Sequence, residues 1–343
     1  MVRVGVVGTS WWADAMYLPA LQNHPEAEVV AVCGRDYQRL KEFAERWNIP
    51  NTYTDWRHML DAGRLEAIII ATPNDTHYPI TMCALDYGLH ILCEKPLSLT
   101  YTQAKEMADA ADAKGVVNMV PFTYRYMPTT RYIKQLIDAD YLGTPYHLNM
   151  RYYAGYGRES KYDWRFDNSI AGAGVVGDLG SHWLHVARWM FGEITSISCH
   201  LETFISRPNR PDGSDYPRGD DSALMTVKFE NGAYGSLQVT TMAYEGTKFG
   251  QTHHMEFHGS SGTLYNFIDW ENTQQVRGLK AGDTGGAQVL DVPEIVWQGA
   301  RQGDPVDTYH DIFRSQNHMT RQFIHAAAEG KQVQPNFREG ARV

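Results

Sequence analysis

Short strand-like apolar runs alternate with helix-forming segments over residues 1–123, and this alternation restricts the possible folds more than any other feature. The runs are Val2–Val7, Glu28–Cys33, Leu65–Ala71, Ile91–Cys93 and Val116–Pro121. Apolar strands separated by helices are typical of a parallel sheet with helices on both faces. The sequence therefore predicts an α/β domain with a doubly wound parallel sheet over residues 1–123.

Residues 124–343 show a different pattern, in which apolar and polar residues alternate with a period of two. The predicted strands are Tyr146–Tyr153, Thr195–Phe204, Ala223–Phe229, Tyr234–Thr241, His254–Gly259 and Gly262–Asn266. This periodicity indicates a largely antiparallel sheet with one covered face. We expect helices at about Asp178–Phe191 and Phe313–Glu329 to cover it. The 343 residues of the chain are also enough for two cores, so a second domain over 124–343 is predicted.

The charge balance argues against several classes of partner. The chain has 31 basic and 40 acidic residues, a formal net charge of −9, and no basic block. Nucleic acid and anionic membranes are therefore not expected partners. The N-terminus runs directly into a strand pattern, without an apolar segment long enough for a signal peptide or membrane span. The cysteines are scattered, which favours reduced thiols and a cytoplasmic location; they are Cys33, Cys83, Cys93 and Cys199.

A glycine turn follows the first predicted strand. Gly8-Thr9-Ser10-Trp11-Trp12-Ala13 has the layout of the dinucleotide fingerprint, with Ser10 in place of the second glycine. A serine still offers its N–H and hydroxyl, so the motif is weakened but retained. Because a strand precedes it and helical sequence follows, this turn predicts a dinucleotide-binding Rossmann domain.

The end of the second strand bears on the choice of cofactor. NAD-binding sites usually have an acidic residue there for the ribose 2′-hydroxyl, whereas an arginine suits the 2′-phosphate of NADP. Gly34 occupies the acidic position and Arg35 follows it, while Asp36 is better placed to cap the next helix. The sequence therefore favours NADP over NAD.

Two polar turns follow the third and fourth of these strands. Thr72-Pro73-Asn74-Asp75-Thr76-His77 comes after Leu65–Ala71, and Glu94-Lys95-Pro96 comes after Ile91–Cys93. Ligands of open α/β sheets bind at the carboxyl ends of the strands, so these turns and Lys95 are candidate site residues. Turn chemistry and helix capping would explain Asn74 and His77 equally well, and Lys95 would then be a surface lysine.

A second group of candidate residues follows the glycine-rich stretch Gly172–Gly177. Asp178 and His182 are four residues apart, and His185 lies three further on, so all three project from one face of a helix. A carboxylate one turn before a histidine can orient the imidazole for general acid or base catalysis. The alternative is that Asp178 caps the helix and His182 is a core histidine.

Two further clusters have more than one interpretation. His254, Glu256 and His258 alternate on one strand face and could ligate a metal, but no matched partner supports this, so no metal site is predicted. Trp164-Arg165, with aromatic and cationic residues before it, suits a sugar-like ring or a loop packed at a domain interface. Arg125, Arg151, Lys161 and Arg165 could bind an anionic substrate group or form salt bridges.

Taken together, these motifs resemble the Gfo/Idh/MocA oxidoreductases over essentially the whole chain. The resemblance rests on the Gly8 turn, Ala71–His77, Glu94-Lys95-Pro96 and Gly177-Asp178-Leu-Gly-Ser-His182. It implies an N-terminal Rossmann domain and an α+β C-terminal domain with a large, mostly antiparallel open sheet. That sheet often mediates oligomerisation in the family, which implies a homodimer or homotetramer. The resemblance also implies a nicotinamide cofactor, with Lys95, Asp178 and His182 around the reacting carbon.

The chain departs from the family pattern at three places. Ser10 replaces a usual glycine, His185 stands where many members have an aspartate, and the chain stops at Val343, where relatives continue into a final helix. The last departure implies that the final helix is missing or truncated.

The predicted function is NAD(P)-dependent hydride transfer at a secondary alcohol or ketone carbon of a sugar, polyol or sugar derivative. The alternatives are a glycoside-cleaving enzyme that retains NAD and oxidises the sugar transiently, and a non-catalytic dinucleotide-binding sensor. The predicted catalytic residues are Lys95, Asp178 and His182. The predicted substrate-binding residues are Lys95, Tyr124, Arg125, Tyr153, Trp164, Arg165, Asp178 and His182. The predicted cofactor-binding residues are Gly8, Thr9, Ser10, Trp11, Trp12, Gly34, Arg35, Thr72, Pro73, Asn74, His77, Glu94 and Lys95.

Overall fold

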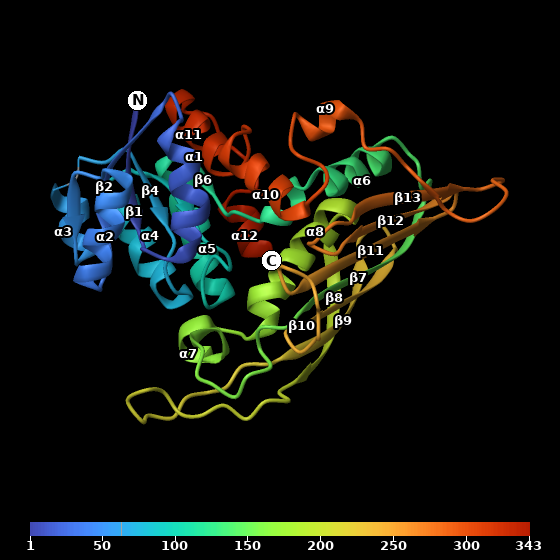
Figure 1. Ribbon diagram of the computed structural model, residues 1–343, viewed down its shortest axis with the longest axis horizontal. Coiled ribbons are helices and arrows are strands. Elements are labelled where there is room, and N and C mark those ends of the chain that lie inside the picture. The colour runs from blue at the N-terminus through green and yellow to red at the C-terminus, as the bar shows by residue number, and fades with distance from the viewer. Residues whose placement is uncertain (63) are drawn as a thin grey trace. The chain divides into compact units, whose positions relative to one another are not determined.

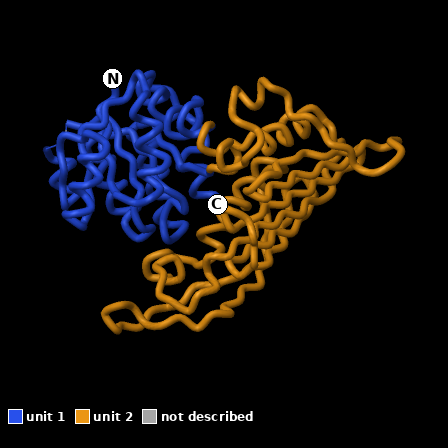
Figure 2. Tube along the Cα trace, viewed as in Figure 1, with its two compact units in different colours: residues 1–122, 312–343 blue, residues 123–311 orange. Residues whose placement is uncertain are grey.

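The computed structural model describes residues 1–62 and 64–343 and divides into two compact units. Unit 1 comprises residues 1–122 and 312–343, and unit 2 comprises residues 123–311 (Figure 2). The sequence analysis placed a single boundary after residue 123 and assigned the rest of the chain to the second domain. That division is wrong for residues 312–343, because the chain returns to complete the core of unit 1.

Unit 1 is built on a six-stranded parallel sheet (Figure 1). The strand order is β3-β2-β1-β4-β5-β6, which is the order of dinucleotide-binding Rossmann domains. The strands are β1 (Val2–Val7), β2 (Ala27–Cys33), β3 (Asn51–Tyr53), β4 (Ala67–Ile70), β5 (His90–Cys93) and β6 (Asn118–Met119). The predicted α/β fold of this part of the chain is confirmed.

Helices connect these strands and pack on the sheet. They are η1 (Ala13–Tyr17), α1 (Leu18–Gln22), α2 (Tyr37–Trp47), α3 (Trp56–Ala62), η2 (Asn74–Thr76), α4 (His77–Asp86) and α5 (Tyr101–Lys114). η1 is a π-helix that leads directly into α1, which has Pro19 in its first turn. Proline has no N–H to donate, and the Ala15 carbonyl four residues earlier accepts from Arg314 Nε at 2.8 Å instead.

The C-terminal segment contributes two helices to unit 1, α11 (Thr320–Glu329) and α12 (Phe337–Arg342). α11 packs against α1, β1 and β5, and α12 packs against α5. Phe337 is buried in the core, and its N–H donates to Asn118 Oδ1 at 2.7 Å. The sequence had predicted that a helix at Phe313–Glu329 would cover the second sheet. That prediction is wrong, because α11 packs on elements of unit 1.

Unit 2 is built on an eight-stranded, mostly antiparallel sheet of order β14-β13-β12-β11-β7-β10-β9-β8, in which only β7 and β10 pair in parallel among the described strands. The strands are β7 (Pro145–Ala154), β8 (Ile194–Glu202), β9 (Ser222–Phe229), β10 (Tyr234–Thr240), β11 (Gln251–Gly259), β12 (Gly262–Ile268), β13 (Gln274–Lys280) and β14 (Gln288–Val289). This confirms the predicted sheet and adds β13 and β14 to it.

One face of this sheet is covered by helices. α6 (Pro128–Asp138) packs against β12 and β13, and α8 (Ser181–Phe191) packs against β7. The remaining helices of unit 2 are η3 (Thr123–Tyr126), η4 (Trp164–Phe166), α7 (Asn168–Ala171), η5 (Val176–Gly180) and α9 (Glu294–Trp297), with α10 (Pro305–Arg314) at the boundary. In β7, Leu148, Met150 and Tyr152 are buried toward the covered face and alternate with more exposed residues.

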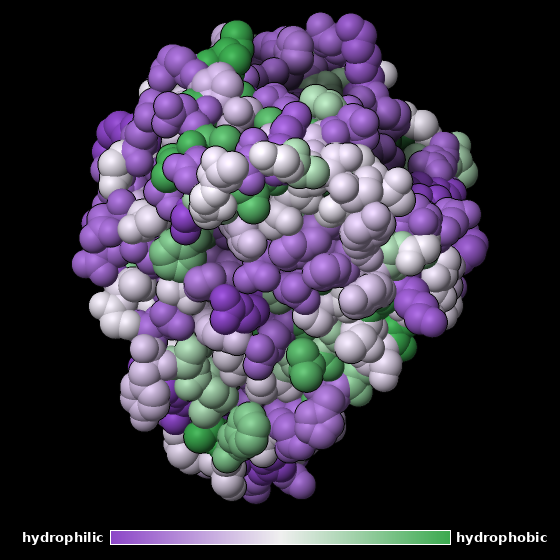
Figure 3. Space-filling view, turned by 90° about the vertical axis from the view of Figure 1, so that its right-hand side faces the viewer, coloured by the Kyte–Doolittle hydropathy of each residue, from purple (hydrophilic) through white to green (hydrophobic). Residues whose placement is uncertain are grey.

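The opposite face, which we call the open face, carries Leu224 on β9 and Tyr234 on β10, both exposed. The surface seen from the right-hand side of Figure 1 has hydrophobic residues interspersed with hydrophilic ones (Figure 3). No helix among the described residues is both long and apolar enough to span a bilayer.

Candidate active site

The glycine turn after β1 has the geometry that the sequence predicted. Gly8 has a φ of +113°, and a Cβ there would lie 2.2 Å from the Ala71 carbonyl oxygen, so a side chain is excluded on both counts. The Ser10 hydroxyl accepts from the Ala13 N–H at 3.2 Å and starts the helix that follows. The turn thus presents a helix N-terminus at the carboxyl end of β1, a place that suits a pyrophosphate.

At the end of β2, the structure separates the roles of Gly34, Arg35 and Asp36. Asp36 caps α2 by accepting from the Arg39 N–H at 3.0 Å, as predicted. Gly34 packs on the glycine turn, where a Cβ would lie 2.9 Å from Thr9 Cγ2. Arg35 is exposed beyond the strand end. Its guanidinium is therefore the charged group that a ribose substituent would meet here.

His77 joins the two polar turns at the carboxyl edge of the sheet. The ring is fully buried, with Nδ1 2.9 Å from the Pro96 carbonyl oxygen and Nε2 3.0 Å from that of Thr72. Burial lowers the pKa of His77, so the neutral ring donates from one nitrogen at a time. His77 therefore ties the turn after β4 to the turn after β5, and Asn74 is buried beside it.

Glu94 holds the main chain next to Lys95. Its carboxylate accepts from the Tyr17 hydroxyl and from the Lys95 N–H, the latter at 3.1 Å. Burial raises the pKa of Glu94, while Lys95 and these hydrogen bonds act in the opposite direction. The Lys95–Pro96 peptide bond is cis. Lys95 thus projects from a turn that is fixed by side chains of η1 and α4.

In unit 2, η5 and α8 form one continuous helical stretch, and Asp220 caps its start. The Asp220 carboxylate accepts from the N–H of Val176 at 3.0 Å and of Gly174 at 3.3 Å. A Cβ at Gly174 would lie 2.3 Å from the Asp220 carbonyl oxygen, which explains the glycine. Because Asp220 supplies the cap, the Asp178 carboxylate is left for other contacts.

Two donors from one segment hold Asp178. The Tyr156 hydroxyl donates to Asp178 Oδ2 at 2.5 Å, and Arg165 Nε lies 3.5 Å from the same oxygen. Desolvation of the hydroxyl and the nearby Asp178 carboxylate raise the pKa of Tyr156 well above that of a free tyrosine. Tyr156 therefore remains a hydrogen-bond donor, and it orients the Asp178 carboxylate. Tyr156 was not among the site residues predicted from the sequence.

His182, one turn after Asp178, lies against Tyr124. The side chain is 5% exposed, and its ring centroid is 4.6 Å from that of Tyr124. The Tyr124 and Tyr152 hydroxyls are 2.7 Å apart, and Tyr152 donates to Gln251 Oε1 at 2.7 Å. Burial raises the pKa of Tyr124 to about 12. The hydroxyl of Tyr124 is thus directed toward Tyr152, while its ring forms one wall for His182.

His185 is held by Arg125, the residue that follows Tyr124. Arg125 Nη1 lies 3.2 Å from His185 Nε2, and its Cζ lies 4.5 Å from the Trp189 ring centroid. Burial, followed by the charge of Arg125, lowers the pKa of His185 well below its usual value. The ring is therefore neutral, with Nε2 as the acceptor.

The structure does not place Tyr153 with these residues. Tyr153 lies on the open face, where its hydroxyl donates to Gln238 Oε1 at 2.7 Å. Its neighbour Tyr152 points to the covered face and contacts Tyr124 and Trp183. Tyr153 therefore lies on the opposite face of the sheet from Tyr152, and its assignment to the substrate site is a prediction that this geometry does not support. The period-two pattern of β7 already contained this information, because Tyr152 shares its face with Leu148 and Met150.

The strand cluster considered as a metal site is engaged in other contacts. His254 Nδ1 lies 3.1 Å from Arg151 Nη2, and His258 Nδ1 lies 3.1 Å from Thr263 Oγ1. The described residues contain no group of three or more histidine, cysteine or acidic side chains arranged to hold a metal ion.

Comparison with known proteins agrees with this geometry. Residues 2–122 match the family model described as an oxidoreductase family with an NAD-binding Rossmann fold, and residues 130–265 match the Gfo/Idh/MocA C-terminal domain. Levoglucosan dehydrogenase of Pseudarthrobacter phenanthrenivorans is 31% identical over 335 residues, which cover 88% of this chain and 81% of that protein. D-glucoside 3-dehydrogenase of Escherichia coli is 28% identical over 240 residues, covering 67% and 68%. A solved structure of levoglucosan dehydrogenase with NADH and levoglucosan has a TM-score of 0.85 at 26% identity and covers 99% of this chain and 93% of that one.

Proposed function

Because the chain belongs to the Gfo/Idh/MocA family of NAD-binding oxidoreductases, we propose that it transfers a hydride reversibly between NAD(P) and a secondary alcohol or ketone carbon of a sugar or polyol. The observation that carries this proposal is the Asp178 carboxylate, which Asp220 frees from capping and which Tyr156 and Arg165 orient one turn before His182. The names of three curated relatives, levoglucosan dehydrogenase, D-glucoside 3-dehydrogenase and D-apiose dehydrogenase, support the same substrate class.

The proposed division of labour follows from the chemistry of each group. The nicotinamide supplies the hydride acceptor or donor when bound. His182 removes the hydroxyl proton as the general base, and Lys95 stabilises the negative charge that develops on the oxygen. Asp178 orients His182 and accepts a hydrogen bond from a neighbouring substrate hydroxyl. The opposite assignment, with Lys95 as the principal base, would use the same residues.

We propose that the substrate is uncharged. Two of the cations considered for an anionic group are paired with carboxylates: Lys161 with Glu159 at 2.6 Å, and Arg165 with both Asp163 and Asp178. Arg151 lies on β7 with the open-face residues and contacts His254. A carboxylate or phosphate on the substrate would have to compete with these protein carboxylates for Arg165, whereas hydroxyl groups can bind beside them.

For the cofactor, we propose a preference for NADP over NAD. Arg35 is exposed at the end of β2, so its guanidinium can be reached by a 2′-phosphate. Asp36 is engaged as the α2 cap and is not available to accept from a 2′-hydroxyl with the same oxygen. Levoglucosan dehydrogenase has been solved in complex with NADH, so NAD and NADP are compared directly in the test below.

We further propose a cytoplasmic location and a homodimer or homotetramer that forms through the open face. All four cysteines are free thiols, which suits a reducing compartment. Leu224 and Tyr234 are exposed on the open face among polar side chains, and such a mixed surface is typical of subunit interfaces.

A substrate screen tests the proposed function. Aldoses, inositols, glycosides, 1,6-anhydro sugars and uronates are each incubated with NAD and NADP, and absorbance of the reduced nicotinamide is followed. We expect turnover of at least one neutral sugar, a higher kcat/KM with NADP, and weak activity on uronates. Glycoside cleavage with retained cofactor and no net absorbance change would instead indicate the transient-oxidation mechanism. Cofactor binding without turnover of any compound would favour the sensor.

A further inference from the structure

The segment of residues 155–172 carries two donors to Asp178 but has little regular structure of its own. Tyr156 and Arg165 both contact the Asp178 carboxylate. The helices in this segment, η4 and α7, span three and four residues. Helices of this length are not stable alone, so contacts from elsewhere must fix the course of the segment.

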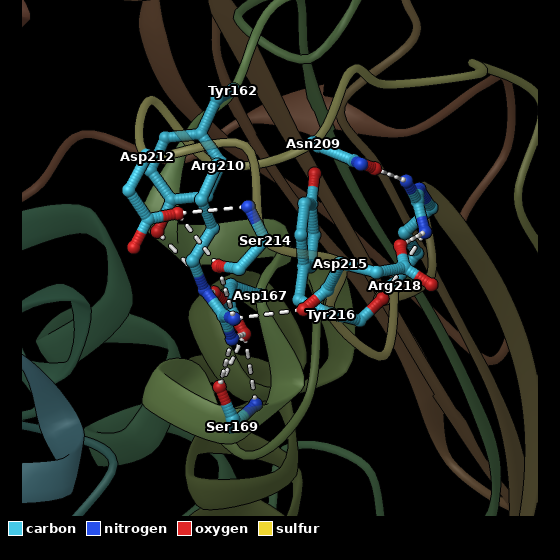
Figure 4. Close-up of polar contacts among 10 residues, drawn as sticks. All are labelled: Tyr162, Asp167, Ser169, Asn209, Arg210, Asp212, Ser214, Asp215, Tyr216 and Arg218. Atoms are coloured by element: carbon cyan, nitrogen blue, oxygen red, sulfur yellow. Dashed lines mark hydrogen bonds and ion pairs between the residues drawn. The ribbon is translucent and has the colours of Figure 1, made fainter.

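Arg210 supplies such a contact from the loop of residues 207–219, which lies between β8 and β9 (Figure 4). Its Nε donates to Asp167 Oδ2 at 2.7 Å, and its Nη2 donates to Asp167 Oδ1 at 3.1 Å and to Ser169 Oγ at 2.7 Å. Asp167 is fully buried and caps α7 by accepting from the Ser169 N–H at 3.1 Å. Burial acts to raise the pKa of Asp167, but the hydrogen bonds from Arg210 and Ser169 hold it below its usual value.

The loop 207–219 is itself ordered by internal contacts. Arg210 Nη1 donates to the Asp215 carbonyl at 2.8 Å, and Arg218 Nη1 donates to Asp215 Oδ1 at 2.8 Å. Both arginines also lie near the ring of the buried Tyr216. The Cζ atom of Arg218 is 4.6 Å from the ring centroid, and that of Arg210 is 5.4 Å from it. Two guanidinium groups near one ring restrict the loop, so it can act as a fixed support.

Main-chain hydrogen bonds join the loop to the residues next to Arg165. The Gly219 N–H donates to the Phe166 carbonyl at 2.8 Å, and the Asn168 N–H donates to the Pro217 carbonyl at 2.9 Å. At the other end of the segment, Arg207 Nη2 donates to the Gly157 carbonyl at 2.8 Å. The loop therefore holds residues adjacent to both Tyr156 and Arg165.

We propose that Arg210 is a positioning residue for substrate binding: by holding Asp167, it keeps Arg165 and Tyr156 in place against Asp178. Arg210 acts through these residues and is not assigned a contact with substrate. The inference rests on the proposed function, because its effect is measured on sugar turnover. It assigns the loop 207–219 a role in the affinity for sugar, separate from cofactor binding.

The test compares Arg210→Ala with the wild-type enzyme on the sugar identified by the screen. We expect KM for the sugar to rise about tenfold with a smaller change in kcat, since a loosened Asp178 loses orientation toward the substrate hydroxyls. The dissociation constant of the reduced cofactor, measured by fluorescence, should not change. Arg210→Lys should restore part of the affinity, because an ammonium group replaces the charge but not the two-pronged contact.

A matched control is Arg277→Ala on β13. Arg277 Nε and Nη2 also fasten a loop of unit 2, through the Ala287 carbonyl, but that loop carries no predicted site residue. This control should leave KM unchanged. If Arg210→Ala folds poorly because Asp167 is left buried without a partner, the double variant Asp167→Asn, Arg210→Met removes that charge and should show the same rise in KM.

Hydrogen exchange separates failure of this inference from failure of the proposed function. Amides of residues 155–172 should exchange faster in Arg210→Ala than in Arg277→Ala. A normal KM in the folded Arg210 variants, or an equal rise in Arg277→Ala, overturns the inference. If the wild-type enzyme turns over no sugar, the proposed function fails. The exchange measurement does not depend on turnover, so unchanged exchange of residues 155–172 in Arg210→Ala would still reject the positioning role.

Discussion

At the scale of single residues, Lys95 is held by contacts on both sides of it along the chain. Glu94 accepts from the Lys95 N–H, and the Pro96 carbonyl contacts the buried His77. A group placed in this way loses little orientational freedom when substrate binds. Preorganisation of this kind is what electrostatic stabilisation of a developing alkoxide requires.

We expect Lys95→Ala to lower kcat by roughly a thousandfold, the upper range for loss of one proton-transfer or charge-stabilising group. Cofactor affinity should remain within about twofold, because the main chain of Glu94 and Pro96 is retained. Steady-state kinetics and cofactor fluorescence titration measure the two effects. Lys161→Ala, which removes an exposed lysine paired with Glu159, is the control, and near-normal turnover of Lys95→Ala would reject the catalytic assignment.

A second residue-scale prediction concerns pH and the buried His253. Its ring packs among Tyr124, Tyr152 and Trp183, with centroid distances of 4.5, 4.3 and 4.7 Å. Neither ring nitrogen has a hydrogen-bond partner among the described residues, and burial lowers the pKa of His253 well below its usual value. The folded protein therefore binds no proton there at a pH at which the unfolded chain does.

Because the unfolded state binds the extra proton, the free energy of unfolding should fall as pH drops below the ordinary histidine pKa of 6.5. One such group contributes at most about 1.4 kcal/mol per pH unit. We expect His253→Leu to lose less stability between pH 7.5 and about pH 5.5 than wild type, by roughly 1 kcal/mol. Urea unfolding at both pH values measures this, and His200→Gln at an exposed site is the control. An unchanged pH dependence in His253→Leu would exclude this explanation.

At the residue scale, the sequence was informative where a motif is local. The Gly8 turn and the Asp36 cap could be recognised because each depends on neighbours a few residues away along the chain. Asp220 could not be recognised as the cap for Val176, because the two are 44 residues apart in sequence. Tyr156 was missed as the donor to Asp178 for the same reason, since a side-chain contact between distant segments leaves no periodic signal.

At the scale of elements, hydrophobic periodicity predicted the strands with strongly apolar faces but not the weaker ones. β13 was missed because Gln274–Lys280 is mostly polar, and β14 was missed because Gln288–Val289 is only two residues long. The helix near Phe313–Glu329 was expected, yet it was assigned to the wrong core. An amphipathic pattern shows that a helix has a buried face, but it does not identify the sheet on which that face packs.

The C-terminal helix α12 provides an element-scale prediction. Phe337 is 1% exposed within the core of unit 1, whereas Arg338 lies at the surface and pairs with Asp109 and Asp112. Phe337→Ala should lower the free energy of unfolding of unit 1 by about 3–5 kcal/mol, because it leaves a cavity. Arg338→Ala should cost at most about 1 kcal/mol, since exposed ion pairs contribute little. Urea unfolding of unit 1, detected by the loss of cofactor binding, measures the stability of both variants. Equal losses of stability in Phe337→Ala and Arg338→Ala would contradict the assignment of α12 to the core.

At the scale of the whole molecule, the proposed assembly through the open face can be tested by placing charge on it. The double variant Leu224→Glu, Tyr234→Glu should shift the protein toward monomer at micromolar concentration, because two desolvated carboxylates would oppose association. Mass from light scattering coupled to size exclusion measures this. Ile295→Glu, at a residue that is 82% exposed on α9, is the control. An unchanged mass in the double variant would place the interface elsewhere.

The return of residues 312–343 to unit 1 has a consequence for synthesis in the cell. The ribosome makes residues 1–122 before it makes α11 and α12. However, α11 packs on β1 and β5, and α12 packs on α5, so these elements wait for their packing partners. All of unit 2 has left the ribosome by then. Until residues 312–343 have been made, the sheet of unit 1 therefore lacks part of its apolar cover. We expect a chaperone to bind that apolar surface during elongation.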